Sequence, residues 1–500
     1  MKLSELFEGL KKYGAPSLIP CGCDPDVTHL EYDSREVSDC GVLFACVPGE
    51  HTDGHDFAGT AAARGAAALL CERPLSAEVP QIVMSGVRGA MGFASSLLYG
   101  VPSGKLKMAG LTGTNGKTTA AYIIRSILRA SGAAAGMMGT VVYDDGRNES
   151  PAGHTTPEGP DIQRLLAKMA ANGASYCVME ASSHGLEQGR LDGCRFCLAG
   201  FSNLTPEHLE FHRDMECYFM AKRKLFTDYM NEDWRGAANA DDDYGRRLLD
   251  EFAGRLSGYS LTDSGRGDFY TASILRMDID GMSLGIKTPG GGSYTVDSPL
   301  TGSHNASNIL ESVVLADLLM FDRDTIRLGI SACPQVPGRL ERYSFSNGVT
   351  VFVDFAHSSD GMEKAIGTLR GLIKGRIHVL WGAGGDRTPV KRPVVGELMA
   401  RLADHVVIST DNPRSESPAD IARDVEAGVL RSGSNVRYET ILDRGEAIDY
   451  ILSSAGGGDA VLIAGKGPER CIEYGTYKVP FADSDAVAEW GRSHGLEILP

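Results

Sequence analysis

The sequence predicts an α/β protein of three domains. These are a smaller α/β amino-terminal domain, a central domain of the P-loop type with a mostly parallel sheet, and a carboxyl-terminal, doubly wound Rossmann-like domain. The chain has 500 residues, and a domain takes about 150. A glycine-rich segment, Gly110 to Thr119, separates a strand pattern from a helix pattern. Beyond residue 333, apolar runs alternate with helical patterns, which is typical of a doubly wound parallel sheet.

Composition excludes several classes of partner. The 65 acidic residues outnumber the 49 basic ones and give a formal charge of −16, which argues against binding to nucleic acid or to an anionic membrane. Eleven scattered cysteines form no spaced metal-binding set, and we expect reduced thiols. No apolar run approaches the length needed to span a bilayer, and the amino terminus has no apolar signal core. We therefore expect a soluble, cytoplasmic protein without membrane insertion.

The predicted amino-terminal domain, residues 1–103, carries few chemical signals. It has short strand patterns and one clear helix pattern, Phe57 to Ala67. Asp33-Ser34-Arg35 precedes an apolar run, and Pro48 to Gly54 indicates a loop rich in turn residues. By themselves these two segments are typical of ordinary surface. Pro102-Ser103-Gly104 suits a linker to the next domain.

The segment from Gly110 to Thr119 reads G-L-T-G-T-N-G-K-T-T and begins the central domain, residues 104–333. Gly113 and Gly116 let the backbone approach a phosphate, and the following helix offers unpaired N–H groups at its start. Lys117 supplies a cation and Thr118 a hydroxyl that can bind Mg²⁺. Leu111 stands where the strict P-loop pattern has a small residue, so the segment is a relative of that pattern. We predict a phosphate-binding loop.

Three later segments of the central domain are ambiguous when each is taken alone. The strand predicted from Tyr176 to Met179 ends at Glu180, which could meet a nucleotide-bound Mg²⁺ or cap the next helix. His208 and His212 are four residues apart and could face one ion, although buried structural histidines are commoner. The basic segment Ala221 to Phe226 would normally form a solvated helix face.

The carboxyl-terminal domain, residues 334–500, gives the clearest pattern. Strands are predicted at 350–354, 377–382, 406–410 and 460–464, with helices beginning near Asp360, Pro393, Pro418 and Asp443. Each strand is followed by polar residues, which a parallel sheet collects at its carboxyl edge. The clusters are Asp354 and His357, Gly384 to Arg387, Asp411 to Arg414, and Gly465 to Glu469. Four clusters at one edge predict a binding site.

Taken together, these segments resemble the Mur ligases, the ATP-dependent amide-forming enzymes of peptidoglycan precursor synthesis, over essentially the whole chain. The loop T-G-T-N-G-K-T-T is shared with the related folylpolyglutamate synthetases. The accompanying motifs narrow the resemblance: D-S-R at Asp33, M-E-A-S-S-H-G-L at Met179, V-P-G-R at Val336, D-F-A-H at Asp354, G-G-D-R at Gly384 and D-N-P-R at Asp411. With G-K-G-x-E at Gly465, the last two are similar to the members that add meso-2,6-diaminopimelate to UDP-N-acetylmuramoyl-L-alanyl-D-glutamate.

The resemblance implies a selector for the amino acid. Diaminopimelate differs from lysine by one carboxylate, which a planar guanidinium holds through two parallel bonds. Arg414 is implied to face that carboxylate, and lysine-adding relatives lack an arginine there. The whole implied diaminopimelate site is Arg387, Asp411, Asn412, Pro413, Arg414, Gly465 and Glu469.

The resemblance also implies sites for the other two substrates. The UDP-muramoyl-dipeptide is expected at Ser34, Glu50, His51, Thr52, His154, Thr155, Thr156, Ser182, Gln188 and Arg190. ATP is expected at Gly113, Thr114, Asn115, Gly116, Lys117, Thr118, Thr119, Asn305, Arg339, Asp354 and His357. We expect no further partner, and a monomer.

The resemblance also implies a metal site and a set of catalytic residues, and the two sets share most of their members. Thr118, Glu180, His208 and Lys222 are the expected Mg²⁺ site, and Lys117 joins the last three in catalysis. Lys222 falls where these ligases carry a lysine carbamate formed with CO₂, and carbamylation turns a cation that repels Mg²⁺ into an anion that binds it. Lys224 is the alternative candidate.

Two segments depart from the family pattern. The metal-binding D-H-L-D is Glu207-His208-Leu209-Glu210 here, which leaves His208 in place. The D-Y-A-H-T-P-D segment is D-F-A-H-S-S-D, and the lost proline changes the loop after His357. Neither change removes a chemical role.

The implied reaction has two steps. ATP phosphorylates the free carboxylate of the D-glutamate residue, and the amine of diaminopimelate then attacks the acyl phosphate; we expect domain closure around the substrates. The alternatives are a ligase of the same type for L-lysine, or one for folate and glutamate. A nucleotide-dependent switch without amino-acid chemistry is the alternative from another class, and the polar strand ends of the third domain argue against it.

Overall fold

The computed structural model describes residues 1–49, 52–262 and 267–499. The described chain forms two compact units. The first comprises Met1–Ser273, Ile286–Tyr294 and Ser307–Ala332, and the second comprises Ile274–Gly285, Thr295–Ala306 and Cys333–Pro500. No helix among the described residues combines the length and apolar content needed to cross a bilayer.

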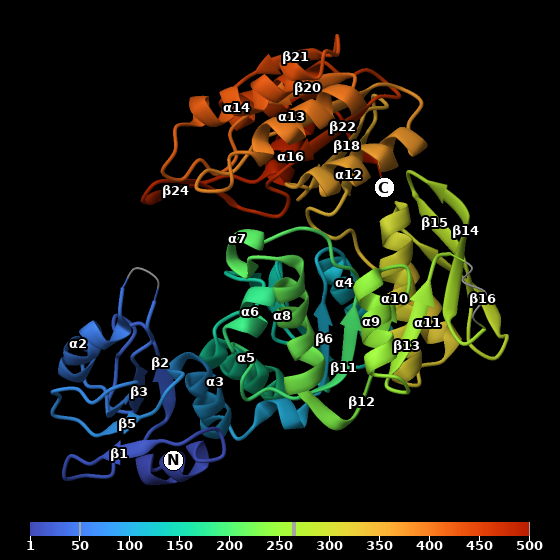
Figure 1. The fold of residues 1–500 in the computed structure, drawn as a ribbon. Helices are drawn as coiled ribbons and strands as arrows, with labels where there is room; N and C mark the ends of the chain where they lie inside the picture. The colour runs from blue at the N-terminus through green and yellow to red at the C-terminus, as the bar shows by residue number, and fades with distance from the viewer. Residues whose placement is uncertain (50–51, 263–266, 500) are drawn as a thin grey trace. The chain divides into compact units, whose positions relative to one another are not determined.

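The amino-terminal part of the first unit is built on a small sheet with the strand order β1-β5-β4-β3-β2 (Figure 1). The strands are β1 (Ser17–Ile19), β2 (His29–Glu31), β3 (Val42–Ala45), β4 (Ala68–Cys71) and β5 (Gln81–Val83), and only β1 of these is antiparallel to its neighbour. Helices α1 (Leu3–Leu10) and α3 (Val87–Leu98) bury apolar side chains in the core with these strands.

A helix is present where Phe57 to Ala67 was predicted to be helical, but the predicted length is wrong. A short 3₁₀ helix, η1 (Gly54–Phe57), leads into α2 (Ala58–Ala63), which ends early because Gly65 takes a left-handed φ of 103°. The N–H of Ala66 then bonds to the carbonyl of Ala61 at 3.0 Å, a helix-terminating turn for which glycine is favoured. Helix α3 was not predicted, because glycines at 89 and 92 weaken its helical pattern.

The larger part of the first unit has a mainly parallel sheet with β6 (Lys107–Thr112) inside it. In this region the strand order is β13-β12-β11-β6-β10-β7-β8-β9. The other strands are β7 (Ala135–Met138), β8 (Val142–Asp144), β9 (Glu149–Pro151), β10 (Tyr176–Glu180), β11 (Phe196–Phe201), β12 (Met230–Asn239) and β13 (Leu256–Ser260). Strand β6 is parallel to both β10 and β11, as the predicted central domain requires.

Helices pack around this sheet and connect its strands. They are α4 (Lys117–Ala130), α5 (Gly159–Ala171), α6 (Ser183–Glu187), α7 (Leu209–His212), α8 (Met215–Asp228), α9 (Asp243–Glu251), α10 (Ser303–Leu318) and α11 (Arg323–Ser331), and η2 (Pro102–Lys105) precedes β6. The division between the two units passes through the region of β14 (Tyr270–Asp278), β15 (Gly281–Lys287), β16 (Ser293–Ser298) and α10.

The second unit contains the predicted doubly wound sheet. Its strand order is β21-β20-β19-β22-β18-β17-β25. The strands that pair in parallel are β18 (Thr350–Asp354), β19 (Ile377–Trp381), β20 (His405–Ile408), β21 (Arg437–Thr440) and β22 (Ala460–Ala464). Strand β17 (Glu341–Phe345) pairs antiparallel with β18 on one side and with β25 (Ile498–Leu499) on the other. The four predicted strands are confirmed. The short polar strand β21 and the antiparallel pair were not predicted.

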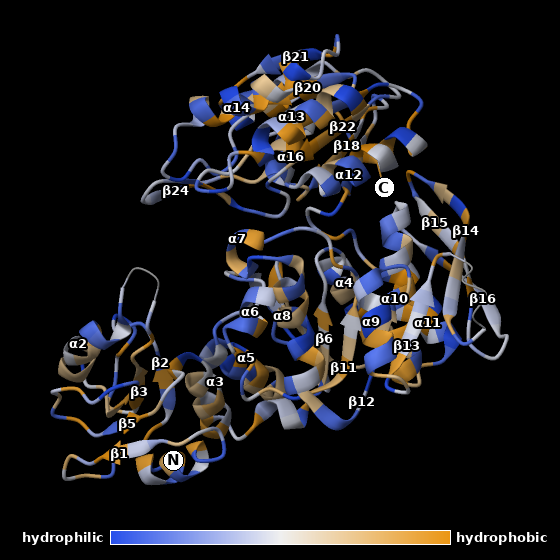
Figure 2. Ribbon diagram, in the orientation of Figure 1, coloured by the Kyte–Doolittle hydropathy of each residue, from blue (hydrophilic) through white to orange (hydrophobic). Residues whose placement is uncertain are grey.

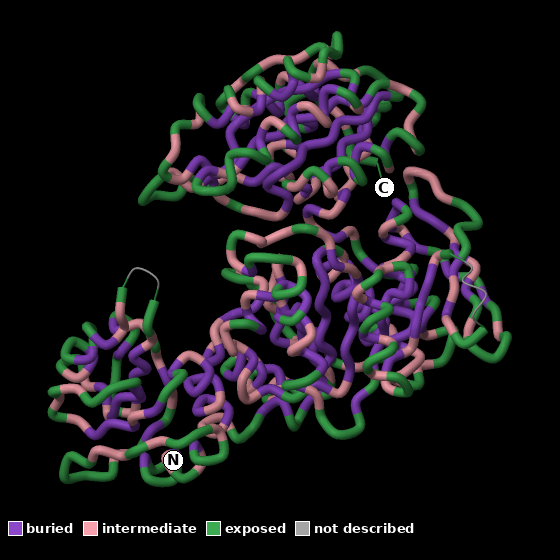
Figure 3. Tube along the Cα trace, in the orientation of Figure 1, coloured by how far each residue is buried: buried purple, intermediate pink, exposed green. Residues whose placement is uncertain are grey.

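Helices cover both faces of this sheet because successive strand residues point to opposite faces. Val379 and Leu462 face one core with α12 (Ser359–Leu372), α13 (Lys391–Leu402) and α14 (Pro418–Arg431). Leu380 and Ile463 face the other with α15 (Arg444–Ser453) and α16 (Asp483–Ser493). The inner strands are therefore apolar (Figure 2) and buried (Figure 3). A hairpin, β23 (Cys471–Tyr474) and β24 (Tyr477–Pro480), lies outside the sheet.

Candidate active site

The predicted phosphate loop joins strand β6 to helix α4. Gly113 and Gly116 take left-handed φ values of 144° and 95°, and α4 begins at Lys117. A Cβ atom on Gly113 would lie 2.0 Å from Oγ of Ser202, and one on Gly116 would lie 2.3 Å from Oδ1 of Asn308. Both positions therefore require glycine, and the strand, glycine turn and helix predicted there are confirmed.

The loop backbone is held by the residues that follow β11, which sequence reasoning did not assign to the site. Thr114 donates its N–H to the carbonyl of Asn203 at 2.8 Å. The side chain of Asn203 accepts from the N–H of Asn115 at 3.0 Å and donates to its carbonyl at 3.1 Å. The only signal in the sequence was that Ser202 and Asn203 are polar residues that follow a predicted strand; the pairing of that strand with β6 came from the structure. Asn203 thus fixes both peptide groups of Asn115.

Two lysines converge on one carbonyl oxygen of the loop. Lys117 donates from Nζ to the carbonyl oxygens of Gly113 at 3.0 Å and Thr114 at 2.9 Å, and Lys222 donates from Nζ to that of Gly113 at 2.7 Å. The side chain of Lys222 is buried. Burial, followed by the nearby charge of Lys117, lowers the pKa of Lys222 well below its ordinary value. An unmodified lysine is therefore poorly accommodated here as a cation.

The basic segment of α8 has one buried and one more exposed face. The interpretation of this segment as a solvated helix face is therefore wrong for Lys222. Lys222 points into the protein, whereas Arg223 pairs with Glu251 and Lys224 lies 2.7 Å from Glu187 near the surface. The structure therefore separates the two candidate lysines: Lys222 adjoins the phosphate loop and Lys224 does not.

Glu180 lies beside the loop because β10 pairs with β6, with Glu180 opposite Leu111. Its buried carboxylate accepts a 3.0 Å bond from the hydroxyl of Thr118. It also accepts from the N–H and hydroxyl of Thr140, at 2.8 and 3.1 Å. Helix α6 is capped by Ser182, so the alternative role of Glu180 as a helix cap is wrong.

The chemistry of this donor set fits Mg²⁺ in part. The ion prefers oxygen ligands and usually takes one or two carboxylates, together with water and substrate phosphates. The hydroxyl of Thr118 and the carboxylate of Glu180 supply two such oxygens side by side. Among the described residues, no group of three or more His, Cys, Asp and Glu side chains is arranged as a complete metal site. Phosphate oxygens would have to complete the coordination.

The histidines form an aromatic cluster. His208 precedes α7 with a left-handed φ of 56°, so His208 and His212 do not lie on one regular helix face. The ring of His184 lies 4.9 Å from that of His208 and 5.4 Å from that of His212, which stacks on Tyr218 at 5.0 Å. Burial lowers the pKa of both His208 and His212 to about 4. Both rings are therefore neutral at pH 7, the form that binds a metal.

Five of the residues expected to bind the UDP substrate lie close to Glu180 or to one another. Thr156 donates its hydroxyl to the carbonyl of Glu180 at 2.8 Å and accepts from the N–H of Ser182 at 3.0 Å. Arg190 donates to the carbonyl of Thr156 and to the side chain of Gln188, both at 2.9 Å. Thr155 shares a 3.0 Å bond with the hydroxyl of Thr140.

The remaining residues of that predicted set lie elsewhere or are not described. Ser34 is buried in the amino-terminal part, while Thr52 and His154 are exposed. Glu50 and His51 lie outside the described residues. Arg190 also lies 3.2 Å from Glu158, which pairs with Arg88 at 2.6 Å. Arg190 is therefore partly neutralised in this structure.

The second unit carries the other four residues predicted to bind ATP. The carboxylate of Asp354, at the end of β18, accepts from the N–H groups of Leu340 and Ala356 at 2.6 and 2.8 Å, and burial raises its pKa. The guanidinium of Arg339 lies 5.0 Å from the ring centre of Phe355. His357 bonds through Nδ1 to the carbonyl of Phe355 at 2.9 Å, and Asn305 donates to the carbonyl of Thr301 at 2.8 Å.

The polar residues after β20 and β22 form one network around the buried Lys466. Asn412 donates to the carboxylate of Glu469 at 2.7 Å. Lys466, whose side chain is fully buried, donates to Asn412 at 3.2 Å, to Glu469 at 3.0 Å and to the carbonyl of Cys471 at 2.6 Å. The structure thus brings the two predicted clusters together. Sequence reasoning quoted Lys466 in its motif but gave it no role.

A buried arginine connects the ends of the same two strands. Arg444 donates to the carbonyls of Thr410 and Ala464, both at 3.0 Å, and pairs with Asp483 at 2.7 and 2.8 Å. The Arg444 and Asp483 side chains are both fully buried. Asp411 lies in this region, where burial raises its pKa and the charges of Arg444 and Lys466 oppose that rise.

The two arginines predicted to contact diaminopimelate lie side by side. A Cβ built on Gly384 would be 3.1 Å from Nη1 of Arg414 and 3.8 Å from Cγ of Arg387. Arg414 donates from Nη1 to the carbonyl of Gly385 at 2.6 Å. Its Nε lies 3.3 Å from the carboxylate of Glu473. The structure therefore brings Arg387 and Arg414 together at the carboxyl edge of the sheet.

The fold and the loop define the chain as an α/β protein with a domain of the nucleotide-binding type, and comparison with known proteins shows that it is a ligase and gives its family. "Mur ligase family, catalytic domain" matches residues 26–90, "Mur ligase middle domain" matches 111–316, and "Mur ligase, glutamate ligase domain" matches 338–467. The chain belongs to the Mur ligase family.

Two similar curated proteins carry the same name, UDP-N-acetylmuramoyl-L-alanyl-D-glutamate--2,6-diaminopimelate ligase. The protein from Geobacillus kaustophilus is 42% identical over 93% of this chain and 95% of its own length. The protein from Geobacillus thermodenitrificans is 40% identical over 98% of both chains. A solved structure with that name matches with a TM-score of 0.64 and 29% identity, over 94% of this chain and 95% of the other. MurF from Acinetobacter baumannii, at 19% identity and a TM-score of 0.66, shows the fold alone.

Proposed function

We propose that the protein adds meso-2,6-diaminopimelate to UDP-N-acetylmuramoyl-L-alanyl-D-glutamate, with ATP as the energy source, in cytoplasmic peptidoglycan precursor synthesis. The observation that carries the proposal is the cluster of polar residues after β20 and β22, where Arg414 lies beside Arg387 and a hydrogen-bonded network joins Asn412, the buried Lys466 and Glu469. A guanidinium in this position suits the distal carboxylate that distinguishes diaminopimelate from lysine. The names of the full-length relatives support the same substrate.

The residues of the first unit would activate the acid. The N–H groups at the start of α4 and the ammonium of Lys117 would hold the ATP phosphates. Arg190 would exchange its contact with Glu158 for an anionic group of the UDP substrate. Transfer of the terminal phosphoryl group to the D-glutamate carboxylate gives an acyl phosphate and ADP. The amine of diaminopimelate then attacks that carbon, and release of phosphate leaves the new amide.

Mg²⁺ would be held by Thr118 and Glu180 together with ATP, with His208 and a modified Lys222 as the further predicted ligands. When bound, the ion neutralises charge on the phosphates. Carbamylation of Lys222 by CO₂ is part of this proposal. It is supported by the convergence of the buried Lys222 and Lys117 on one carbonyl, because an anionic carbamate at Lys222 would replace the repulsion between two neighbouring ammonium groups by attraction.

The test of the carbamate is ¹³C NMR of the protein equilibrated with ¹³C-bicarbonate. Wild-type protein should show a carbamate carbon that Lys222→Arg lacks and that Lys224→Arg keeps. A spectrum without that signal at neutral pH, or a signal retained in Lys222→Arg, would contradict the modification while leaving the ligase proposal intact.

The test of the reaction is phosphate release from ATP in the presence of the UDP-dipeptide, comparing meso-diaminopimelate with L-lysine. Wild type should turn over with diaminopimelate and only weakly with lysine. Arg414→Ala should raise KM for diaminopimelate at least about tenfold, since one charged hydrogen-bonded contact contributes about 1.5–3 kcal/mol. Arg431→Ala, an exposed arginine at the end of α14, is the control.

Each alternative predicts a different result. Preference for lysine would keep the ligase and replace the amino acid. Glutamate-dependent turnover with a folate acceptor would place the chain with the folate ligases. ATP hydrolysis that ignores both acceptor and amino acid would exclude the ligase and favour a nucleotide switch.

The domain boundaries 1–103, 104–333 and 334–500 and the monomeric state remain part of the proposal. Limited proteolysis followed by mass measurement of the fragments tests the boundaries. Sedimentation at several protein concentrations tests the monomer.

A further inference from the structure

Arg414 has an unusual backbone that the β23–β24 hairpin holds in place. Its φ is 50°, in the left-handed region, which costs a residue with a side chain about 1–2 kcal/mol. Arg414 donates its N–H to the carbonyl of Glu473 at 2.9 Å, and its own carbonyl accepts from the N–H of Gly475 at 2.7 Å. A parallel bridge joins Arg414 to Tyr474. Backbone strain of this kind persists where surrounding contacts fix it, and it clusters at ligand sites.

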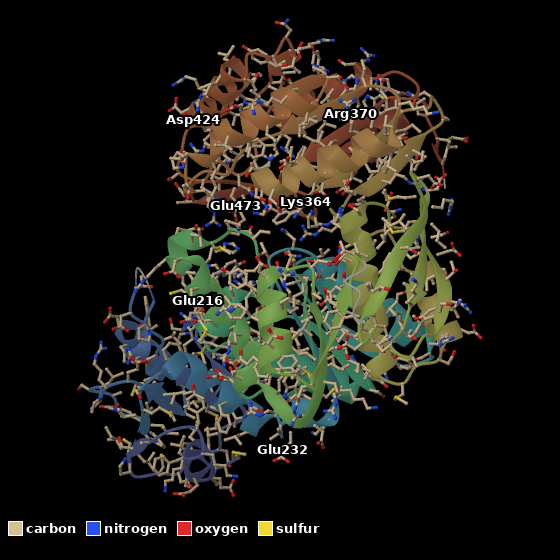
Figure 4. All side chains as sticks on the ribbon, turned by 45° about the vertical axis from the view of Figure 1, so that its right-hand side comes forward. Glu216, Glu232, Lys364, Arg370, Asp424 and Glu473 are labelled. Atoms are coloured by element: carbon tan, nitrogen blue, oxygen red, sulfur yellow. The ribbon has the colours of Figure 1, made fainter. Side chains whose placement is uncertain are left out.

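The same hairpin also holds the side chain of Arg414. The carboxylate of Glu473 (labelled in Figure 4) lies 3.3 Å from Nε, and Gly385 accepts from Nη1 at 2.6 Å. A guanidinium has five N–H donors in a fixed plane. These two contacts engage the N–H of Nε and one N–H of Nη1. The second N–H of Nη1 and those of Nη2 can therefore donate to a second carboxylate.

The position of Glu473 is itself fixed by a cation. Lys478, on the opposite strand of the hairpin, lies 2.6 Å from the other carboxylate oxygen, and this contact lowers the pKa of Glu473. Stacked rings of Tyr474 and Tyr477, 5.6 Å apart, join the two strands of the hairpin next to it. Glu473 therefore stays ionised at neutral pH and stands between Lys478 and Arg414.

We propose that Glu473 is a positioning residue for amino-acid selection: it orients the guanidinium of Arg414 so that the Nη1–Nη2 edge faces the distal carboxylate of the amino acid. The inference rests on the proposed function, because Glu473 has this role only if Arg414 selects diaminopimelate. In an alternative role, Glu473 competes for the guanidinium of Arg414, and the substrate carboxylate must displace it. The contact at Nε favours orientation, since a bidentate ligand can use the opposite edge without displacing Glu473.

The experiment measures kcat and KM for meso-diaminopimelate and L-lysine in Glu473→Ala and Glu473→Gln. Glu473→Ala should raise KM for diaminopimelate about tenfold, a change of about 1.4 kcal/mol, and leave the low activity with lysine and the KM values for ATP and the UDP-dipeptide unchanged. Glu473→Gln keeps an acceptor for Nε and should give a smaller rise. Glu489→Ala, which removes the exposed partner of Arg492 on α16, is the matched control.

Three outcomes separate this inference from the proposed function. If Arg414→Ala leaves KM for diaminopimelate unchanged, the proposed selector fails and Glu473 loses its role with it. If Arg414→Ala raises that KM but Glu473→Ala does not change it, the positioning role alone is overturned. If Glu473→Ala lowers that KM, Glu473 is the competitor.

A structural effect of the substitution is distinguishable from positioning. General damage to the fold would change all three KM values and the activity with lysine, whereas lost orientation changes only the constant for diaminopimelate. If Glu473→Ala does not fold, Lys478→Met provides the second variant, because it frees Glu473 without touching Arg414. It should raise KM for diaminopimelate two- to threefold, and no rise would overturn the inference.

Discussion

The predicted phosphate loop and the polar cluster after β20 and β22, the proposed amino-acid site, both lie at the carboxyl ends of parallel strands, but different contacts hold them. Besides the bonds from Lys117 and Lys222, the loop is fixed by main-chain hydrogen bonds and by the amide side chain of Asn203, at glycines that leave no room for a Cβ. The cluster after β20 and β22 is fixed by ion pairs, the fully buried pair of Arg444 with Asp483 and the pair of the buried Lys466 with the partly exposed Glu469. The first region should therefore be most sensitive to added volume, and the second to lost charge.

The largest effect on activity is expected for Gly113→Ala. The added methyl would meet Oγ of Ser202 at 2.0 Å, at a φ of 144° that alanine rarely adopts. The loop would have to move away from the phosphate position, and we expect kcat/KM for ATP to fall at least about 100-fold, which corresponds to about 2.7 kcal/mol. Nucleotide binding measured by calorimetry checks this. Gly59→Ala, where nothing lies within 4 Å of the added atom, should bind ATP normally; equal loss in both variants would contradict the volume argument.

A stability effect comes next, for Arg444→Met in the second unit. The substitution approximates the volume of the side chain but leaves the buried carboxylate of Asp483 without its partner. Removing one member of a buried ion pair costs about 3–5 kcal/mol, so the urea midpoint of unfolding should fall markedly. Arg444→Met combined with Asp483→Leu should recover much of the loss, because no isolated charge remains. If the double variant is as unstable as the single one, unpaired charge is not the cause.

An effect that is smaller per pH unit concerns a buried carboxyl group next to Gly200 of strand β11. Glu311 is buried on α10, and burial raises its pKa to about 8. The folded state therefore retains a proton that the unfolded chain releases near pH 4.5, so the free energy of unfolding should fall as pH rises from about 5 to 8, by at most about 1.4 kcal/mol per pH unit.

Glu311→Gln should remove that dependence while keeping a similar shape. Urea unfolding of both proteins at pH 5.5, 6.5 and 7.5 checks this, and the variant should gain stability relative to wild type as the pH rises. Glu363→Gln on α12, an exposed position in the second unit, is the control. Parallel pH profiles for wild type and Glu311→Gln would show that Glu311 is ionised in the folded protein.

The sequence by itself determined the α/β class, the doubly wound sheet and the phosphate loop. These features depend on local rules: strand and helix periods differ, and a glycine turn at Gly113 and Gly116 followed by a lysine and a hydroxyl is the pattern that predicts a phosphate-binding loop. The same reasoning predicted that Asp411 to Arg414 and Gly465 to Glu469 belong together, because parallel strands end at one edge.

Only the tertiary structure decided which of the ambiguous residues face inward. Lys222 and Lys224 are two positions apart in one basic segment, yet the helix turns one toward Gly113 and the other toward Glu187. The supports of the site were hidden for the same reason. Asn203, Arg444 and Glu473 lie far along the chain from the loops they hold, and the energy of a buried contact depends on what surrounds it in space, which sequence spacing does not reveal.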